Sequence, residues 1–226
     1  DFDFVLYPQS RHGLERSLAV DEIVERELLA FLPHGHEVRT LGRSAEKLKP
    51  LAAKGAKIHA GAFDDVQSLT QAFAGCAGVF TMIPPDMTAP DYRTFQDQVG
   101  EAIARALAQA KIAHVVNLSS VGAELSENNG VIQGLHFEEE RLNALPGLSV
   151  IHLRPVSFME NLLWDIPMIK NQGFWGGFFR PESPVEMIAT RDIADRAAEV
   201  LLSLDFQGSA FQELLGQRDL TMTEVT

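Results

Sequence analysis

The chain has 226 residues, of which 46% are hydrophobic and 22% charged, so it is long enough for a globular domain with a substantial core. Its formal net charge of −12 argues against a sequence-independent grip on nucleic acid or on an anionic membrane. The single cysteine, Cys76, excludes an internal disulfide and thiolate zinc clusters, and no apolar run approaches the roughly 20 residues of a membrane helix.

Short apolar runs alternate with helix-like stretches as far as Pro155. The apolar runs predict six strands: Phe4–Tyr7, Glu37–Leu41, Lys57–Ala60, Gly78–Ile83, His114–Leu118 and Ser149–Leu153. The stretches between them predict five helices: Ala19–Leu32, Ala45–Lys54 with Ser44 as N-cap and Gly55 beyond its end, Ser68–Ala74, 91–111 and Leu135–Leu145. Because strands and helices alternate, we expect an α/β fold, a Rossmann-type doubly wound parallel sheet covered on both faces.

The residue composition of the chain changes after Pro155. Aromatic and apolar residues are concentrated in a short predicted helix, and a strongly amphipathic helix is predicted over Ile193–Leu204, either capped by Thr190 or preceded by Arg191 and Asp192. We therefore expect residues 1–155 to form a dinucleotide-binding domain and residues 156–226 to form a small substrate-side region at the carboxyl edge of the sheet. Thr221–Thr226 reads as the start of another helix, so the chain looks truncated.

The second predicted strand, Glu37–Leu41, is followed by Gly42, Arg43 and Ser44, with Lys47 one helical turn further on. In a doubly wound sheet, the adenosine ribose of a dinucleotide lies at this strand end, where an acidic residue reads a 2′-hydroxyl and an arginine accepts a 2′-phosphate. This stretch therefore favours NADP(H) over NAD(H), although each of these side chains has a plain alternative as a solvated surface group.

Five segments, in order, resemble the NmrA-like atypical short-chain dehydrogenases. They are Gly35–Ser44, Gly61–Phe80, Val115–Ala123, Leu153–Leu162 and Ala189–Leu201. The family includes NADPH-dependent quinone reductases, triphenylmethane-dye reductases and regulators that sense the cofactor without catalysis. The resemblance implies hydride transfer from NADPH to a quinone-like or conjugated small molecule; the alternative is a non-catalytic NAD(P) sensor that acts through a protein partner.

The resemblance also assigns residues to the site. It places Phe63 beside the adenine, Met82, Ile83 and Pro84 along the ribose and pyrophosphate, and Pro155 and Phe158 over the nicotinamide. Asn161 and Trp164 would then face the substrate. Simpler alternatives stay open, because an apolar strand end before two prolines needs no ligand, and Asp64 and Asp65 are expected first of all to cap a helix.

Candidate catalytic groups are few. Ser119 and Ser120 end the fifth predicted strand near the expected nicotinamide site, and His136 could supply a proton near neutral pH. The Tyr-x-x-x-Lys pair of typical short-chain dehydrogenases is missing, since neither Tyr7 nor Tyr92 has a lysine four residues later. This absence weakens ordinary ketone chemistry and suits an acceptor that delocalises charge. The histidines are scattered, so no metal site is expected.

The N-terminal turn departs from the family. Where the family has G-x-x-G-x-x-G against the pyrophosphate, this chain has Pro8–Ser17 with one glycine. A degenerate cofactor site, a different grip on the pyrophosphate and an incorrectly read N-terminal sequence all fit; the abrupt return to the pattern at Gly35 favours the last. The N-terminus lacks a signal peptide, so we expect a cytoplasmic protein, and a homodimer is among the arrangements that the sequence allows.

Overall fold

The computed structural model describes residues 4–6, 31–86, 88–177 and 179–225, and contains a seven-stranded sheet in the order β10-β6-β5-β4-β1-β2-β3. All its neighbouring strands are parallel. The strands are β1 (Phe4–Leu6), β2 (Val38–Gly42), β3 (Lys57–Ala60), β4 (Gly78–Met82), β5 (His114–Leu118), β6 (Ser149–Pro155) and β10 (Ser209–Leu214). The strand order reverses between β1 and β4, which makes this the switch point of a doubly wound sheet and confirms the predicted Rossmann-type fold.

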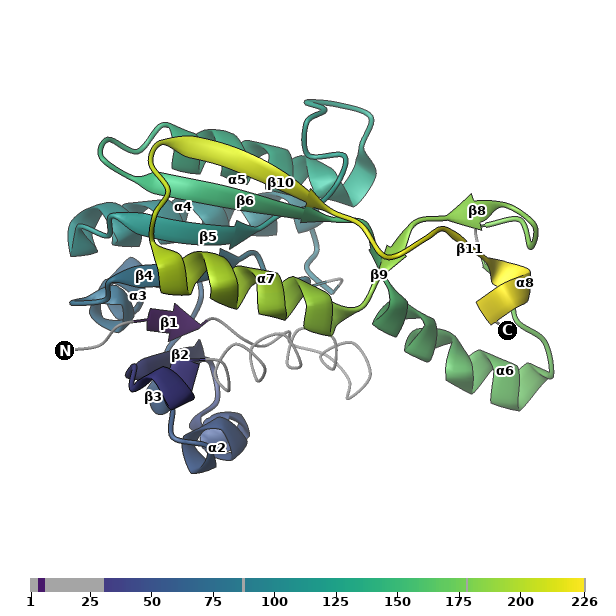
Figure 1. The fold of residues 1–226 in the computed structure, drawn as a ribbon, viewed down its shortest axis with the longest axis horizontal. Coiled ribbons are helices and arrows are strands. Elements are labelled where there is room, and N and C mark those ends of the chain that lie inside the picture. The colour runs from purple at the N-terminus through teal and green to yellow at the C-terminus, as the bar shows by residue number, and fades with distance from the viewer. Residues whose placement is uncertain (1–3, 7–30, 87, 178, 226) are drawn as a thin grey trace.

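Helices cover both faces of the sheet (Figure 1). On one side, α4 packs against both α3 and α5, and on the other side α7 lies across β4, β5 and β6. The helices of these layers are α3 (Val66–Phe73), α4 (Tyr92–Ala110), α5 (Gln133–Asn143) and α7 (Thr190–Ser203), and α2 (Ala45–Ala53) lies beside β2 and β3. No helix in the described part of the chain is long and apolar enough to cross a membrane.

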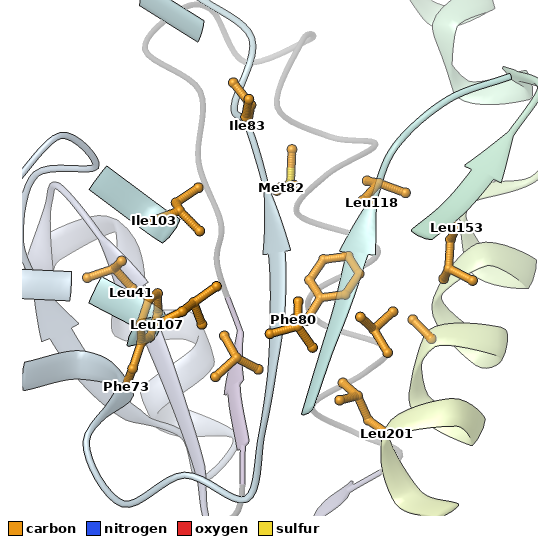
Figure 2. Close-up of a cluster of buried hydrophobic side chains, with 14 of the residues drawn as sticks. Leu41, Phe73, Phe80, Met82, Ile83, Ile103, Leu107, Leu118, Leu153 and Leu201 are labelled. Carbon is orange, nitrogen blue, oxygen red and sulfur yellow. The ribbon is translucent and has the colours of Figure 1, made fainter. Parts of the chain in front are cut away.

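The central strands are apolar on both faces because both are covered. Every residue of β4 is buried, and Figure 2 shows Phe80 on the side of Leu118 of β5 and Leu201 of α7. On α4, Val99, Ile103 and Leu107 recur every four residues and are almost completely buried, as the sequence predicts. This continuous core fixes the relative positions of the strand ends that form the site.

A smaller lobe lies beyond the carboxyl ends of the strands, at the right of Figure 1. It contains the 3₁₀ helix η3 (Met159–Asp165), α6 (Ile166–Gln172), α8 (Met222–Val225) and two short pairings, β7 (Ser157–Phe158) with β9 (Met187–Ile188) and β8 (Pro184–Val185) with β11 (Leu220–Thr221). The predicted boundary at Pro155 coincides with the end of β6. However, β10 and α7 come after it in the chain and belong to the sheet layers.

Most predicted elements agree with the structure within a few residues. Ser44 begins α2, its Oγ accepting a long hydrogen bond of 3.5 Å from the Lys47 amide, and Gly55 follows the helix with a φ of 110°. Thr190 does not cap α7 with its side chain: it is the first helical residue, and its amide donates to the Glu160 carboxylate at 3.0 and 3.1 Å. The helix predicted over Ala19–Leu32 and the Pro8–Ser17 turn lie outside the described residues, apart from the last two positions of that helix.

A chain of polar side chains links β4, β5, β6 and α5; Thr81, Asn117 and His152 are buried, and Asn143 of α5 is exposed. The Thr81 hydroxyl donates to Asn117 at 3.1 Å, the Asn117 amide donates to His152 Nδ1 at 3.1 Å, and His152 Nε2 donates to the Asn143 amide oxygen at 2.9 Å. This arrangement uses both ring nitrogens of a neutral imidazole. Burial lowers the pKa of His152 to about 4 from its ordinary 6.5, even though the charge of Glu139 acts in the opposite direction.

We expect His152 to make the protein less stable in acid. Between pH 7 and pH 4, the unfolded chain takes up a proton that the folded chain excludes, which should lower the free energy of unfolding by about 3 kcal/mol. Urea denaturation across this range should show a flatter pH dependence for His152→Gln, whereas His34→Gln, at an exposed histidine, should follow the wild type. A wild-type slope in His152→Gln would contradict this account.

Candidate active site

The candidate site lies where β4, β5 and β6 end. Because these strands are parallel, their carboxyl ends meet at one edge of the sheet, bringing together Met82 and Ile83, Ser119 and Ser120, and Pro155. These residues line a cavity of about 780 Å³. This volume is large enough for a small aromatic molecule beside part of a cofactor.

The small lobe closes the far side of the cavity. Its wall includes three residues that the sequence assigned to cofactor or substrate: Phe158, Asn161 and Trp164. Phe179 and Val185 complete an apolar surface on this side. Eight of the site residues predicted from the sequence thus line this one cavity: Met82, Ile83, Ser119, Ser120, Pro155, Phe158, Asn161 and Trp164.

The sequence missed the contribution of α4. Tyr92 and Gln96, in the first two turns of this helix, also line the cavity. Gln96 is held by a 3.0 Å hydrogen bond from Nε2 to the Val131 carbonyl, and it approaches Gly134 so closely that any Cβ at this glycine would overlap it. A signal was present: Asp91 is an N-cap directly after the β4 loop, so the first turn of the helix had to lie at the same sheet edge.

Ser119 belongs to a buried charged cluster behind the cavity wall. Its hydroxyl donates to Glu139 Oε1 at 2.5 Å, and Arg154 donates to both oxygens of Glu139, from Nε at 3.0 Å and from a terminal nitrogen at 2.6 Å. Burial alone would raise the pKa of Glu139, but the hydrogen bonds from Arg154 and Ser119 outweigh it and hold the pKa below its ordinary value. Glu139 is therefore a carboxylate, and the Ser119 proton points to it rather than into the cavity.

The Ser120 hydroxyl proton is also used within the protein, because it is donated to the Val121 carbonyl at 2.9 Å. His136 does not line the cavity: Nδ1 lies 2.7 Å from the Ala123 carbonyl oxygen and Nε2 lies 3.5 Å from Glu140. Both of its ring nitrogens thus face protein groups. Its catalytic role remains a prediction to which this geometry adds no support.

A second cavity of about 420 Å³ lies at the ends of β2 and β3. The guanidinium of Arg43 lies 5.4 Å from the centre of the Phe63 ring, and both residues line this cavity together with Asp64 and residues of the β4–α4 connection. The two acids after β3 divide their roles. Asp65 caps α3 by accepting from the amides of residues 67 and 68, whereas Asp64 is exposed at the cavity wall.

Three predicted cofactor contacts do not line either cavity. Ser44 caps α2, Lys47 is exposed on the same helix, and Pro84 is buried in the turn after β4. Their assignments stay predictions. Among the described residues, no cluster of His, Cys, Asp and Glu could hold a metal ion.

The larger cavity has an acidic rim. Among the described residues that line it, the only charged ones are Glu186 and Asp219, and both are exposed. The other polar side chains of its wall are hydroxyls, amides and the Trp164 indole. The wall is otherwise apolar, which is typical of a pocket for a small organic molecule.

Comparison with known proteins identifies the family. The model of the NmrA-like family matches residues 22–226. The chain belongs to the NmrA-like family. A (4-alkanoyl-5-oxo-2,5-dihydrofuran-3-yl)methyl phosphate reductase from Streptomyces griseus subsp. griseus is 29% identical over 203 residues, which cover 90% of this chain and 68% of that protein.

Solved structures of this shape include reductases crystallised with their cofactor. The Escherichia coli NADPH-dependent quinone oxidoreductase in complex with NADPH has a TM-score of 0.75 at 20% identity, over 98% of this chain and 72% of that one. The Citrobacter sp. triphenylmethane reductase in complex with NADP(H) has a TM-score of 0.71 at 16% identity, over 99% and 73%. At these low sequence identities, the likeness shows only that this chain has the same fold as the two reductases.

We predict that Glu139→Gln lowers the free energy of unfolding by about 3 kcal/mol, because it leaves the buried Arg154 cation without its main counter-charge. Thermal or urea denaturation measures this loss. Glu140→Gln is the matched control, since the neighbouring Glu140 is exposed and its loss should cost less than about 0.5 kcal/mol. Equal effects of the two substitutions would show that the buried pair does not hold this end of the sheet.

Proposed function

We propose that the chain is an NADPH-dependent reductase that transfers hydride to a quinone-like or conjugated small-molecule acceptor bound in the larger cavity. The observation that carries this proposal is the position of that cavity, at the carboxyl ends of β4, β5 and β6 in a doubly wound sheet. The curated relative and two of the structural neighbours are reductases, and both of these neighbours bind NADP(H).

The described residues fit the two halves of such a cofactor. In the smaller cavity, Arg43 supplies a cation for the 2′-phosphate, and Phe63 supplies a ring for the adenine. In the larger cavity, Met82, Ile83 and Pro155 supply the apolar wall for the nicotinamide half. Bound NADPH supplies the hydride, and the residues of the wall orient the acceptor and exclude water.

The walls also restrict the charge of the acceptor. Phe158, Trp164 and Phe179 form a surface that suits a flat apolar ring system. The carboxylates of Glu186 and Asp219 would repel an anionic group at the rim, whereas they tolerate a neutral molecule and attract a cation. The acceptor is therefore an uncharged or cationic conjugated molecule, unlike the phosphate ester named for the Streptomyces griseus relative.

Anaerobic NADPH oxidation with a panel of acceptors tests this function. We expect turnover with naphthoquinones and with triarylmethyl cations, and at least about tenfold lower kcat/KM for sulfonated analogues of the same ring systems. Tight NADPH binding in calorimetry without turnover of any acceptor would contradict a reductase and indicate a sensor. Absence of NADPH binding would contradict both.

Arg43→Ala should weaken the binding of NADPH far more than that of NADH. The substitution removes a charge-assisted contact with the 2′-phosphate, which NADH lacks, so we expect roughly a 10-fold to 100-fold increase in the Kd for NADPH. Lys47→Ala is the comparison, because Lys47 is exposed and does not line the cavity. Calorimetry that shows equal losses for the two cofactors in Arg43→Ala would overturn this role.

A further inference from the structure

Reduction of a quinone in the larger cavity requires a proton donor in its wall. If the proposed function holds, hydride transfer to a quinone leaves an anionic oxygen, which must accept a hydrogen bond and then a proton. The two serines at the end of β5 cannot donate it in this geometry. Their hydroxyl protons are directed to Glu139 and to the Val121 carbonyl, so both serines can only accept hydrogen bonds from a ligand.

The other acid–base groups of the region are also unsuitable. His136 lies outside the cavity with both ring nitrogens facing protein groups. Glu186 and Asp219 are exposed acidic side chains at the rim, and a carboxylate accepts hydrogen bonds rather than donating them.

Tyr92 has the properties that these groups lack. It lies in the first turn of α4, lines the cavity and is half-buried, with its ring 6.5 Å from that of Phe95. Within the described part of the chain, its hydroxyl has no hydrogen-bond partner, so its proton is available. Burial, and then the charge of Asp86, raise the pKa of Tyr92 above its ordinary value and keep the phenol protonated at neutral pH.

Other donors in the wall are much weaker acids. Ser157 and Asn161 line the cavity without a hydrogen-bond partner among the described residues, and Gln96 keeps one amide hydrogen beyond its bond to Val131. An aliphatic hydroxyl or an amide can donate a hydrogen bond but does not release a proton in water. A phenol, with an ordinary pKa of about 10, is close in acidity to a hydroquinone, so a proton can be shared or transferred between them.

We propose that Tyr92 is the catalytic residue that donates a hydrogen bond, and then a proton, to the oxygen of a quinone as hydride arrives from NADPH. Hydride brings two electrons and one proton to the quinone, the Tyr92 O–H bond breaks as the new O–H bond forms, and the resulting tyrosinate recovers a proton from water. The products are NADP⁺ and the hydroquinone. Ser119 and Ser120 are then acceptors that position donor groups of the bound molecules.

This role makes the effect of Tyr92→Phe depend on the acceptor. We expect kcat to fall at least about tenfold with 1,4-naphthoquinone. With a triarylmethyl cation, kcat should stay within about twofold, because hydride alone converts the cation to a neutral product and no proton is needed. The Kd of NADPH should not change. Phenylalanine keeps the ring and its contact with Phe95, so a general loss of packing would instead lower both activities.

The pH dependence gives a second readout. The charged groups around Tyr92 are Asp86, in the β4–α4 loop, and Glu186 and Asp219, which line the same cavity, and no cation lines that cavity among the described residues. The wild-type kcat for the quinone should therefore fall at high pH as Tyr92 ionises, and Tyr92→Phe should lose this limb. Ser157→Ala, which removes another cavity hydroxyl, should retain it.

A third readout needs no turnover. The chain has two tyrosines, so a protein labelled with ¹³C at the tyrosine ring carbon that bears the hydroxyl gives two resonances, and Tyr92→Phe assigns them. Addition of 1,4-naphthoquinone to the NADP⁺ complex should shift the Tyr92 signal. Equal kcat values of Tyr92→Phe and wild type on the quinone, or an unmoved Tyr92 signal, would overturn the proposal. Failure of the wild type to reduce any acceptor would instead overturn the proposed function.

Discussion

The ion pair between Arg154 and Glu139 joins the end of β6 to α5 and, through Ser119, to the end of β5. Both side chains are almost completely buried, so the attraction between their charges is offset by the free energy of removing them from water. Such a pair therefore fixes the arrangement of the strand ends more than it raises the stability of the fold. The Phe211 ring of β10 covers the guanidinium at 4.1 Å. This pair fixes the strand ends that carry the cavity and determines which way the Ser119 hydroxyl points.

That direction divides the cavity into two chemical sides. At the end of β5, the serines offer only hydrogen-bond acceptors, because a carboxylate and a carbonyl take their protons. On the α4 side, the Tyr92 hydroxyl lines the cavity and has no hydrogen-bond partner among the described residues. In the proposed mechanism, an acceptor between these sides meets apolar walls from the small lobe and an acidic rim, and the one phenol that can give its oxygen a proton, among the described wall residues, lies on the α4 side. The proposed mechanism thus draws binding, orientation and proton supply from three different parts of the chain.

The fold and much of the cavity could be predicted from the sequence because they depend on local signals. Buried parallel strands are apolar throughout, and residues just after such strands must meet at one edge, which placed Ser119, Met82 and Phe158 together. Strand β10 was missed because it is an edge strand whose side chains are mostly exposed. The donor directions of the serines and the position of Tyr92 depend on tertiary partners, such as Glu139, that no local pattern indicates.

The central claim is that an acceptor in the larger cavity receives hydride directly from NADPH. Transfer from NADPH carrying deuterium at one or the other C4 position to a triarylmethyl cation tests this most directly, because the new carbon–hydrogen bond does not exchange with water. The account predicts one deuterium in each molecule of product from one labelled epimer and none from the other, since the cavity holds the acceptor on one side of the nicotinamide. Unlabelled product from both epimers, or equal labelling from each, would contradict it.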